Sequence, residues 1–292
     1  MGPTAVGKTT VAIELAGSFS TEIISADSRQ FFKEMIIGTA KPSKTELASV
    51  KHHLVNSLSV TEEYNVGMFE RDALRILTDI FSKKDIAIMA GGSGLYINAV
   101  CNGFDEVPQA DKEVRANLTA MYKKEGIDYL QSTLQKLDPV HYKKVDIKNP
   151  HRLIRAIEVC TVTGKPYSDL RKGKKQKRDF NVVKIGLNME REKLYKKINA
   201  RVDEMMKAGL LEEVRSLDKY KELNSLKTVG YNELFNHLDR KTDLKQAVDL
   251  IKQNTRNFAK RQMTWFRKDE EIQWFEPSDL SGMIAFIKEK SV

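Results

Sequence analysis

The chain has 292 residues, of which 41% are hydrophobic, and this length is enough for one large domain or two smaller ones with a real core. No apolar run approaches the length of a membrane span, and two distant cysteines make neither a disulfide framework nor a metal cluster. We therefore expect a cytoplasmic protein without a membrane partner. The net charge of +9 favours a polyanionic partner, with a lysine-rich solvated surface as the alternative explanation.

The first residues carry a phosphate-binding pattern. Gly2–Thr9 match G-x-x-x-x-G-K-[ST], in which backbone N–H groups surround an anion, Lys8 adds a cation and the Thr9 hydroxyl can ligate Mg²⁺. A helix predicted over Thr10–Ala16 directs its positive end to the same point. The residues predicted to bind a diphosphate are therefore Gly2, Pro3, Thr4, Ala5, Val6, Gly7, Lys8 and Thr9. Such a loop normally follows a buried strand, and because only Met1 precedes it we expect that strand to have been lost by truncation.

Apolar runs that alternate with amphipathic segments predict an α/β fold, with a parallel sheet covered by helices on both faces. The predicted strands are Glu22–Ala26, Ile86–Ala90, Asn181–Leu187 and Ile272–Phe275. A helix is predicted over Met68–Lys83, between the first and second strands, and another over Leu95–Val100, after the second strand. Asp27-Ser28 and the Gly91–Gly94 turn each follow a strand. Ligands of parallel sheets bind at the carboxyl ends of strands, so these segments and the phosphate loop should converge on one site.

Residues 109–179 have a different character, because three helical patterns occur there with no strand between them. They cover Val114–Tyr122, Ile127–Leu137 and Pro150–Thr163, and the last begins with the favourable Asn149-Pro150 pair. We predict an inserted all-helical domain over residues 109–179, with residues 1–108 and 180–292 forming the catalytic core. The basic run at 171–178 is equally well explained as a solvated loop.

A long helix is predicted over Ala247–Lys268. Apolar spacing assigns it a buried face of Val248, Ile251, Thr255, Phe258, Gln262 and Trp265. A separate arc carries Lys252, Arg256, Lys260 and Arg267. Four cations in one stripe repel one another and suit a track for phosphates, while an ordinary basic helix face remains the alternative.

Taken together, these segments resemble the tRNA dimethylallyltransferase (tRNA isopentenyltransferase) family over nearly the whole chain. No single segment is specific, but their joint order and spacing are. The matching segments are Gly2–Thr9, Ser25–Gln30, Ile37–Pro42, His52–Leu54, Gly91–Tyr96, Arg152–Val159, Thr163-Gly164, Val229–Tyr231, Thr255–Gln262 and Thr264–Phe266. The resemblance implies a P-loop NTPase-like core and an inserted helical domain that helps to hold tRNA.

The resemblance also implies a reaction: transfer of the dimethylallyl group from dimethylallyl diphosphate to N6 of the adenosine 3′ to the anticodon, with Mg²⁺ and release of diphosphate. Asp27 would then be the general base, with helix capping or an indirect role at Mg²⁺ as its alternatives, and Lys8, Thr9 and Ser93 would act on the diphosphate. A monomer is expected. The residues that the resemblance assigns to tRNA are Asp27, Ser28, Arg29, Gln30, Ser93, Arg115, His151, Arg152, Leu153, Ile154, Arg155, Thr228, Gly230 and Tyr231. The basic helix adds Arg256, Lys260, Arg261 and Arg267 to these expected tRNA contacts.

Three other functions stay open from the residues alone. A prenyltransferase for free adenine nucleotides would share the core but needs no basic track. A P-loop kinase that binds ATP would leave Asp27–Gln30 and Thr255–Trp265 without a role, and a nucleotide switch lacks an Asn-Lys-x-Asp element. His52 and His53 are adjacent, so at most one of them can face the site.

Overall fold

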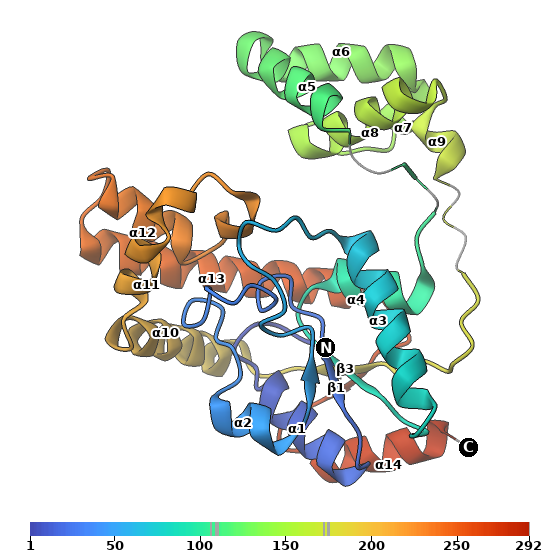
Figure 1. The fold of residues 1–292 in the computed structure, drawn as a ribbon, viewed down its shortest axis with the longest axis vertical. Helices are drawn as coiled ribbons and strands as arrows, with labels where there is room; N and C mark the ends of the chain where they lie inside the picture. The colour runs from blue at the N-terminus through green and yellow to red at the C-terminus, as the bar shows by residue number, and fades with distance from the viewer. Residues whose placement is uncertain (106, 109–110, 172, 174–175, 292) are drawn as a thin grey trace. The chain divides into compact units, whose positions relative to one another are not determined.

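The computed structural model describes residues 1–105, 107–108, 111–171, 173 and 176–291. It divides into two compact units, the first formed by Met1–Cys101 with Arg178–Val292 and the second by Asn102–Lys177 (Figure 1). The second unit is therefore inserted into the sequence of the first. The basic positions 172, 174 and 175 of the predicted run lie outside the described residues.

The first unit is organised around a three-stranded parallel sheet of order β2-β1-β3, with β1 at Ile23–Ser25, β2 at His52–His53 and β3 at Ile88–Ala90. Ile24 of β1 stands opposite His53 on one side and Met89 on the other. All three residues of β1 are buried, as expected for the central strand of a parallel sheet.

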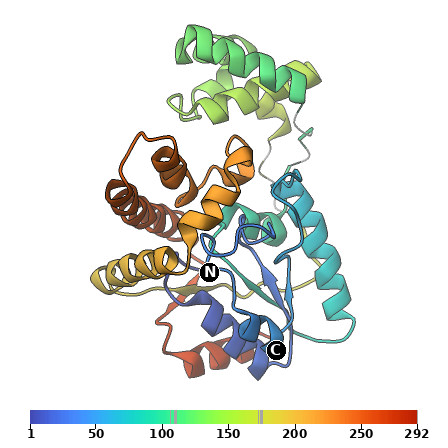
Figure 2. The same cartoon turned by 60° about the vertical axis from the view of Figure 1, so that its left-hand side comes forward.

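Helices cover this sheet on both faces, as the sequence predicts (Figure 2). On one face, α3 (Val66–Phe81) and α4 (Gly94–Asn102) pack against Ile24 and Ala26. On the other, α1 (Lys8–Ser18) packs against Ile23, and α14 (Leu280–Lys290) packs beside α1. The short helix α2 (Lys44–Ser49) leads into β2 and is capped by Ser43. These layers pack against both faces of β1, and Asp27 follows two residues after the end of this strand.

The two later strands form a separate parallel pair, which differs from the single sheet that the sequence predicts. β4 spans Ile185–Leu187 and pairs with β5 at Gln273–Phe275. On the other side of β4, the Met1 amine donates to the Ile185 carbonyl over 2.7 Å and the Leu187 N–H donates to the Met1 carbonyl over 2.8 Å. A cavity of about 520 Å³ lies between β3 and β4. The fold is thus a mixed α/β fold with small parallel sheets.

A group of helices completes the first unit: α10 (Arg191–Lys207), α11 (Leu210–Ser216), α12 (Tyr231–Leu238) and α13 (Leu244–Phe266), with short 3-10 turns at Asp218–Tyr220 and Asn224–Leu226. Apolar side chains of all four helices share one core. Tyr231 lies at its centre and is fully buried.

The buried face of α13 differs from the predicted one in its second half. Ala247, Ile251, Ala259, Gln262 and Phe266 are buried, whereas Phe258 and Trp265 are 39% and 46% exposed. The two predicted core aromatics therefore lie on the solvent side. The small residue Ala259 takes the buried position because α10 packs closely against this part of α13.

Within the described residues of the second unit, all regular secondary structure is helical. It contains α5 (Lys112–Glu125), α6 (Ile127–Leu137), α7 (Pro139–Tyr142), α8 (Pro150–Thr163) and α9 (Tyr167–Leu170). Leu130, Leu134, Leu153 and Ile157 form its core, and the bounds of α6 and α8 are those that the sequence predicts. In neither unit does a described helix combine the length and apolar character needed to cross a membrane.

Candidate active site

The phosphate loop is held in a shape that non-glycine residues rarely adopt. Ala5 has φ 64° and Gly7, the residue before α1, has φ 110°, so successive N–H groups turn toward the same side of the loop. Lys8 begins α1 and donates from Nζ to the Pro3 carbonyl over 2.7 Å. The loop and its lysine therefore form a concave group of hydrogen-bond donors, the arrangement that an anion requires.

Asp27-Ser28 and the Gly91–Gly94 turn come together beside this loop. Ala26 N–H donates to the Ala90 carbonyl, Ser93 N–H donates to the Ala26 carbonyl, and Ser28 N–H donates to Ser93 Oγ over 3.0 Å. A Cβ at Gly91 would lie 2.1 Å from the Ala26 carbonyl oxygen, so this approach requires glycine. A cavity of about 40 Å³ here is lined by residues that include Lys8, Thr9, Ser25, Asp27, Gln30, His52 and Gly91. The predicted convergence of the three segments is confirmed.

Gln262 of α13 ties the phosphate loop to the glycine turn. Its Oε1 accepts from Thr4 N–H over 2.8 Å, and its Nε2 donates to the Gly92 carbonyl over 2.9 Å. The side chain is buried, so both bonds are shielded from water and fix the two loops relative to each other. Its spacing predicts burial correctly, but it does not indicate this bridging role.

Arg201 of α10 is a site residue that the motifs do not reveal. Its guanidinium donates to Thr4 Oγ1 over 3.3 Å, and burial lowers its pKa below the usual range of arginine while Asp27 raises it. One signal was available in the sequence: Arg201 follows Leu194 and Ile198 at helical spacing, on the apolar stripe of α10. A cation on a buried stripe needs a negative partner.

The electrostatics of the cavity favour an anionic ligand. Burial lowers the pKa of Lys8 to about 8; Asp27 opposes that shift and Arg201 adds to it. Arg29 is also largely desolvated, which lowers its pKa. Three largely desolvated cations, Lys8, Arg29 and Arg201, thus interact with one carboxylate, Asp27. The unbalanced positive charge would be satisfied by a bound diphosphate.

The donor set suits Mg²⁺ but does not form a metal cage. The Thr9 hydroxyl and the Asp27 carboxylate line the same cavity and are hard oxygen donors. Among the described residues, no group of three or more His, Cys, Asp or Glu side chains is placed to hold a metal. Mg²⁺ is commonly held by one or two protein oxygens plus substrate phosphates and water, and these residues fit that pattern.

Other predicted residues near the cavity already have protein partners. Asp27 Oδ1 accepts from Arg29 N–H over 2.9 Å, which leaves Oδ2 without that bond. The Gln30 amide donates to the Thr39 and Ala40 carbonyls and accepts from Ser25 Oγ, so it holds the following loop. Of the two histidines, His52 lines the cavity and His53 pairs with Glu22 over 2.5 Å, as the strand alternation predicts.

The residues predicted to contact tRNA on α12 and α13 fall into two groups. Lys260 and Arg261 are exposed on α13, and Arg267 is exposed directly after its end. Arg256 of α13 donates to Asn199 of α10 over 2.7 Å. Tyr231 is fully buried and donates from its hydroxyl to Glu213 over 2.6 Å, and Gly230 is buried and donates its N–H to Glu233. Thr228 is half-buried. The Tyr231 side chain therefore serves the core and offers no surface to an RNA.

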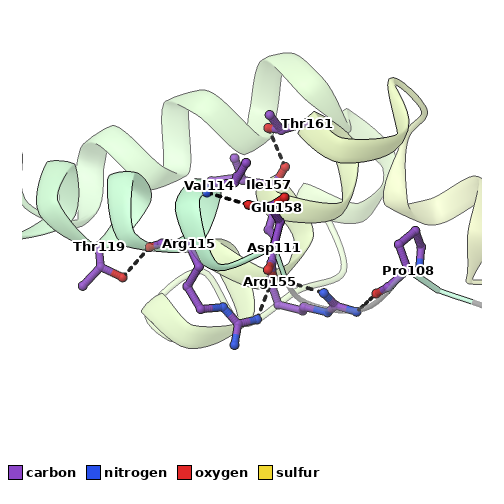
Figure 3. A network of polar contacts seen from close by, with 9 residues as sticks. All are labelled: Pro108, Asp111, Val114, Arg115, Thr119, Arg155, Ile157, Glu158 and Thr161. Atoms are coloured by element: carbon purple, nitrogen blue, oxygen red, sulfur yellow. Dashed lines mark hydrogen bonds and ion pairs between the residues drawn. The ribbon is translucent and has the colours of Figure 1, made fainter. Parts of the chain in front are cut away.

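The predicted residues of the second unit also divide by burial. His151 and Arg152 are exposed at the start of α8, whereas Leu153 and Ile154 are buried in the helical core and cannot present side chains to RNA. Arg115 and Arg155 both donate to Oε2 of Glu158, over 2.6 and 3.1 Å, and Arg155 also donates to the Pro108 carbonyl (Figure 3). Glu158 itself is fully buried. The two arginines are thus fixed by an internal carboxylate.

An α/β fold with a phosphate loop, a carboxylate beside it and a helical inserted unit defines a class of nucleotide- or diphosphate-binding enzymes. The model of the IPP transferase family matches residues 30–269, which is more than half of the chain. This chain belongs to the IPP transferase family.

One relative of known name and two solved structures are similar to this chain over nearly its whole length. The chain is 55% identical over 276 residues to the tRNA dimethylallyltransferase of Christiangramia forsetii, covering 94% of this chain and 91% of that protein. The crystal structure of the tRNA isopentenylpyrophosphate transferase of Bacillus halodurans is 35% identical with TM-score 0.74, covering 99% of this chain and 94% of that one. A eukaryotic dimethylallyltransferase acting on tRNA is 26% identical with TM-score 0.78, covering 99% of this chain and 76% of that one.

Proposed function

We propose that this chain transfers the dimethylallyl group from dimethylallyl diphosphate to N6 of the adenosine on the 3′ side of the anticodon in tRNA, releasing diphosphate. The observation that carries the proposal is the single cavity lined by Lys8, Thr9 and Asp27, with Arg201 fixed to the same loop through Thr4. This arrangement joins an anion cradle to a carboxylate, which an alkyl transfer from a diphosphate to an amine requires.

The cradle acts on the leaving group. As the bond between the allylic carbon and the diphosphate oxygen breaks, its electron pair stays on the diphosphate, and the new bond forms from N6 to the same carbon. The loop N–H groups, Lys8 and Arg201 stabilise the charge that develops on the departing oxygen. Mg²⁺ held by Thr9 would neutralise further charge on the diphosphate.

Asp27 would take the proton that N6 loses on alkylation. Its Oδ1 accepts from Arg29 N–H, and this bond orients the carboxylate while Oδ2 stays available as the base. The adenine must leave the stacked anticodon loop to reach it, as in other enzymes that modify bases. Ser28 and Ser93 are positioned at this point by their mutual hydrogen bond.

The exposed face of α13 supports an RNA substrate over a free nucleotide. Lys260, Arg261 and Arg267 can contact phosphates, and the two exposed aromatic rings offer flat surfaces for unpaired bases. The Arg261 guanidinium lies 5.8 Å from the centre of the Phe258 ring, which pairs one cation with one stacking surface. The Trp265 indole lies against Gly94, next to Ser93. Exposed His151 and Arg152 would add contacts from the second unit.

Finer features are part of the same proposal. The core would be P-loop NTPase-like and the enzyme a cytoplasmic monomer that uses Mg²⁺. Arg115 and Arg155 would contact tRNA from their fixed positions on Glu158. Transfer to a free adenine nucleotide, or phosphoryl transfer from ATP, would make no use of the exposed cations and rings of α13.

The test combines two donors with two acceptors: dimethylallyl diphosphate or ATP, with unmodified tRNA or AMP. Product is expected only from dimethylallyl diphosphate and tRNA, and product from ATP with a small acceptor would refute the proposal. Asp27→Asn should lower kcat by about 10² to 10⁴-fold with little change in tRNA affinity. Equal losses of turnover and of binding would assign Asp27 a structural role instead.

A further inference from the structure

The Glu213 carboxylate of α11 accepts hydrogen bonds from three successive backbone N–H groups of one loop. Its Oε2 accepts from Ile36 N–H over 2.9 Å and from Ile37 N–H over 2.7 Å, and its Oε1 accepts from Gly38 N–H over 3.0 Å. Oε1 also accepts from the Tyr231 hydroxyl over 2.6 Å. These donors match the lone pairs of an ionised carboxylate, so both oxygens must act as acceptors.

The loop over residues 36–40 is fixed by these bonds as one unit. It is closed on itself, because Ala40 N–H donates to the Ile37 carbonyl over 2.9 Å. Gly38 lies directly against Tyr231 of α12, and a Cβ at this glycine would come within 2.5 Å of the ring. Glu213 from one side and the Tyr231 ring from the other therefore hold the loop on α11 and α12.

The same loop holds the side chain of Gln30, which lines the small cavity together with Asp27. Gln30 Nε2 donates to the Thr39 carbonyl over 3.2 Å and to the Ala40 carbonyl over 3.3 Å. Carbonyls only accept, so this end of the amide must be the nitrogen, and both of its hydrogens are used. Oε1 accepts from Ser25 Oγ over 3.2 Å and keeps a second lone pair. The loop thus leaves Gln30 only as an acceptor.

We propose that Glu213 is a positioning residue for prenyl transfer: it holds the loop over residues 36–40, and this loop keeps the Gln30 amide in its acceptor orientation in the cavity. The inference rests on the proposed function. An acceptor there suits the amino group of an adenine, which presents two hydrogens, because Asp27 would remove one of them and Gln30 Oε1 would hold the other.

The substitution Glu213→Gln changes one atom and should break this arrangement. The new NH₂ group would face the N–H groups of Ile36 and Ile37, or that of Gly38. Two donors that face each other lose the bond and keep the cost of leaving water. The matched control is Glu212→Gln, because this neighbouring carboxylate is 67% exposed and pairs only with Arg215 at 3.9 Å among the described residues.

The kinetic test is a double-mutant cycle between Glu213→Gln and Gln30→Ala. Glu213→Gln alone should lower kcat about 10- to 100-fold, with less than about a threefold change in KM for dimethylallyl diphosphate, which the phosphate loop binds. In the Gln30→Ala background the same substitution should lower kcat less than about threefold, because its effect passes through Gln30. Glu212→Gln should leave kcat unchanged in both backgrounds.

Gly38→Ala displaces the same loop without changing the carboxylate, because its Cβ meets the Tyr231 ring. It should reproduce both the loss of kcat and the dependence on Gln30, and it keeps the test decisive if Glu213→Gln fails to fold. A full loss of kcat in the Gln30→Ala background would show that Glu213 only supports the fold. That result, or an unchanged kcat in Glu213→Gln, would overturn the proposal.

Two further measurements do not depend on prenyl transfer. Hydrogen exchange at the Ile37 and Gly38 amides should become at least about tenfold faster in Glu213→Gln and stay unchanged in Glu212→Gln. The side-chain amide NMR signals of Gln30, assigned with Gln30→Ala, should shift in Glu213→Gln alone. If the unchanged chain transfers no prenyl group to tRNA, the proposed function is refuted, and these two measurements decide the link from Glu213 to Gln30. Unchanged exchange or unchanged Gln30 signals would overturn that link.

Discussion

The buried carboxylate of Glu158 makes a quantitative prediction about the second unit. Glu158 is 0% exposed, and its Oε2 accepts from both Arg115 and Arg155, whose side chains are 47% and 31% exposed. Oε1 has no hydrogen-bond partner among the described residues. Either arginine alone can hold the carboxylate, so their removal should be strongly non-additive.

The expected loss of unfolding free energy depends on how many arginines remain to pair with Glu158. A hydrogen bond to a charged group contributes about 1.5–3 kcal/mol. Because both arginines are partly solvated and Glu158 keeps the other one, Arg115→Ala or Arg155→Ala should each cost about 1 kcal/mol. The double variant leaves a fully buried carboxylate without a cation, which costs about 3–5 kcal/mol. The interaction between the two sites should therefore be about 1–3 kcal/mol.

The assay is a double-mutant cycle measured by urea unfolding, read from hydrogen exchange of peptides within α8 so that the second unit is followed directly. A triple variant with Glu158→Gln is the matched control, since it removes the buried charge and should recover much of the loss. Additivity of the two single effects within about 0.5 kcal/mol would refute the reasoning, because it would mean that Glu158 is not held jointly.

Three further predictions concern the first unit. Lys8→Met should weaken pyrophosphate binding about 100-fold or more at pH 7. Because the Lys8 pKa is about 8, the ratio of the two affinities, measured by calorimetry, should fall as the pH rises from 7 to 9 and Lys8 loses its charge. A ratio that grows with pH would contradict the assignment of Lys8 to the diphosphate. Gly91→Ala should destabilise the fold by about 1–3 kcal/mol in thermal unfolding, because its Cβ meets the Ala26 carbonyl. The matched control is Gly17→Ala in the last turn of α1, where a Cβ meets no other atom within 4 Å, and it should stabilise the fold by up to about 0.5–1 kcal/mol. Lys260→Ala should reduce the slope of log K for tRNA binding against log salt concentration by about 0.7–0.9. Lys252→Ala is the control and should leave this slope nearly unchanged, because Lys252 is paired with Asp203 over 2.6 Å. Equal slopes for the two variants would show that Lys260 does not contact the RNA.

Local patterns predicted the parts of this fold that local forces determine. The helices over Ile127–Leu137 and Pro150–Thr163 have the predicted bounds, because Gly126 and the Asn149-Pro150 pair set where each begins. The strands over residues 23–25 and 88–90 lie inside the predicted runs, and they carry Asp27 and Gly91 to the phosphate loop as expected. These features follow from residues a few positions apart.

The parts that the sequence did not predict depend on partners that are distant along the chain. The buried face of α13 turns at Ala259 because α10 packs there, and spacing alone could not show that Phe258 and Trp265 would be displaced to the surface. Arg201 reaches Thr4 across almost two hundred positions. Likewise, β4 pairs with β5 and not with β3, and no pattern within residues 181–187 indicates which strand is the partner.

These long-range contacts also explain how the site holds its shape before any ligand binds. Gln262 of α13 joins the phosphate loop to the glycine turn, and Arg201 of α10 reaches Thr4 of the same loop. Lys260, Arg261 and Trp265 are therefore exposed on the same helix whose buried Gln262 bonds to the phosphate loop. The buried Gln262 amide thus joins one helix to both Thr4 of the phosphate loop and Gly92 of the glycine turn.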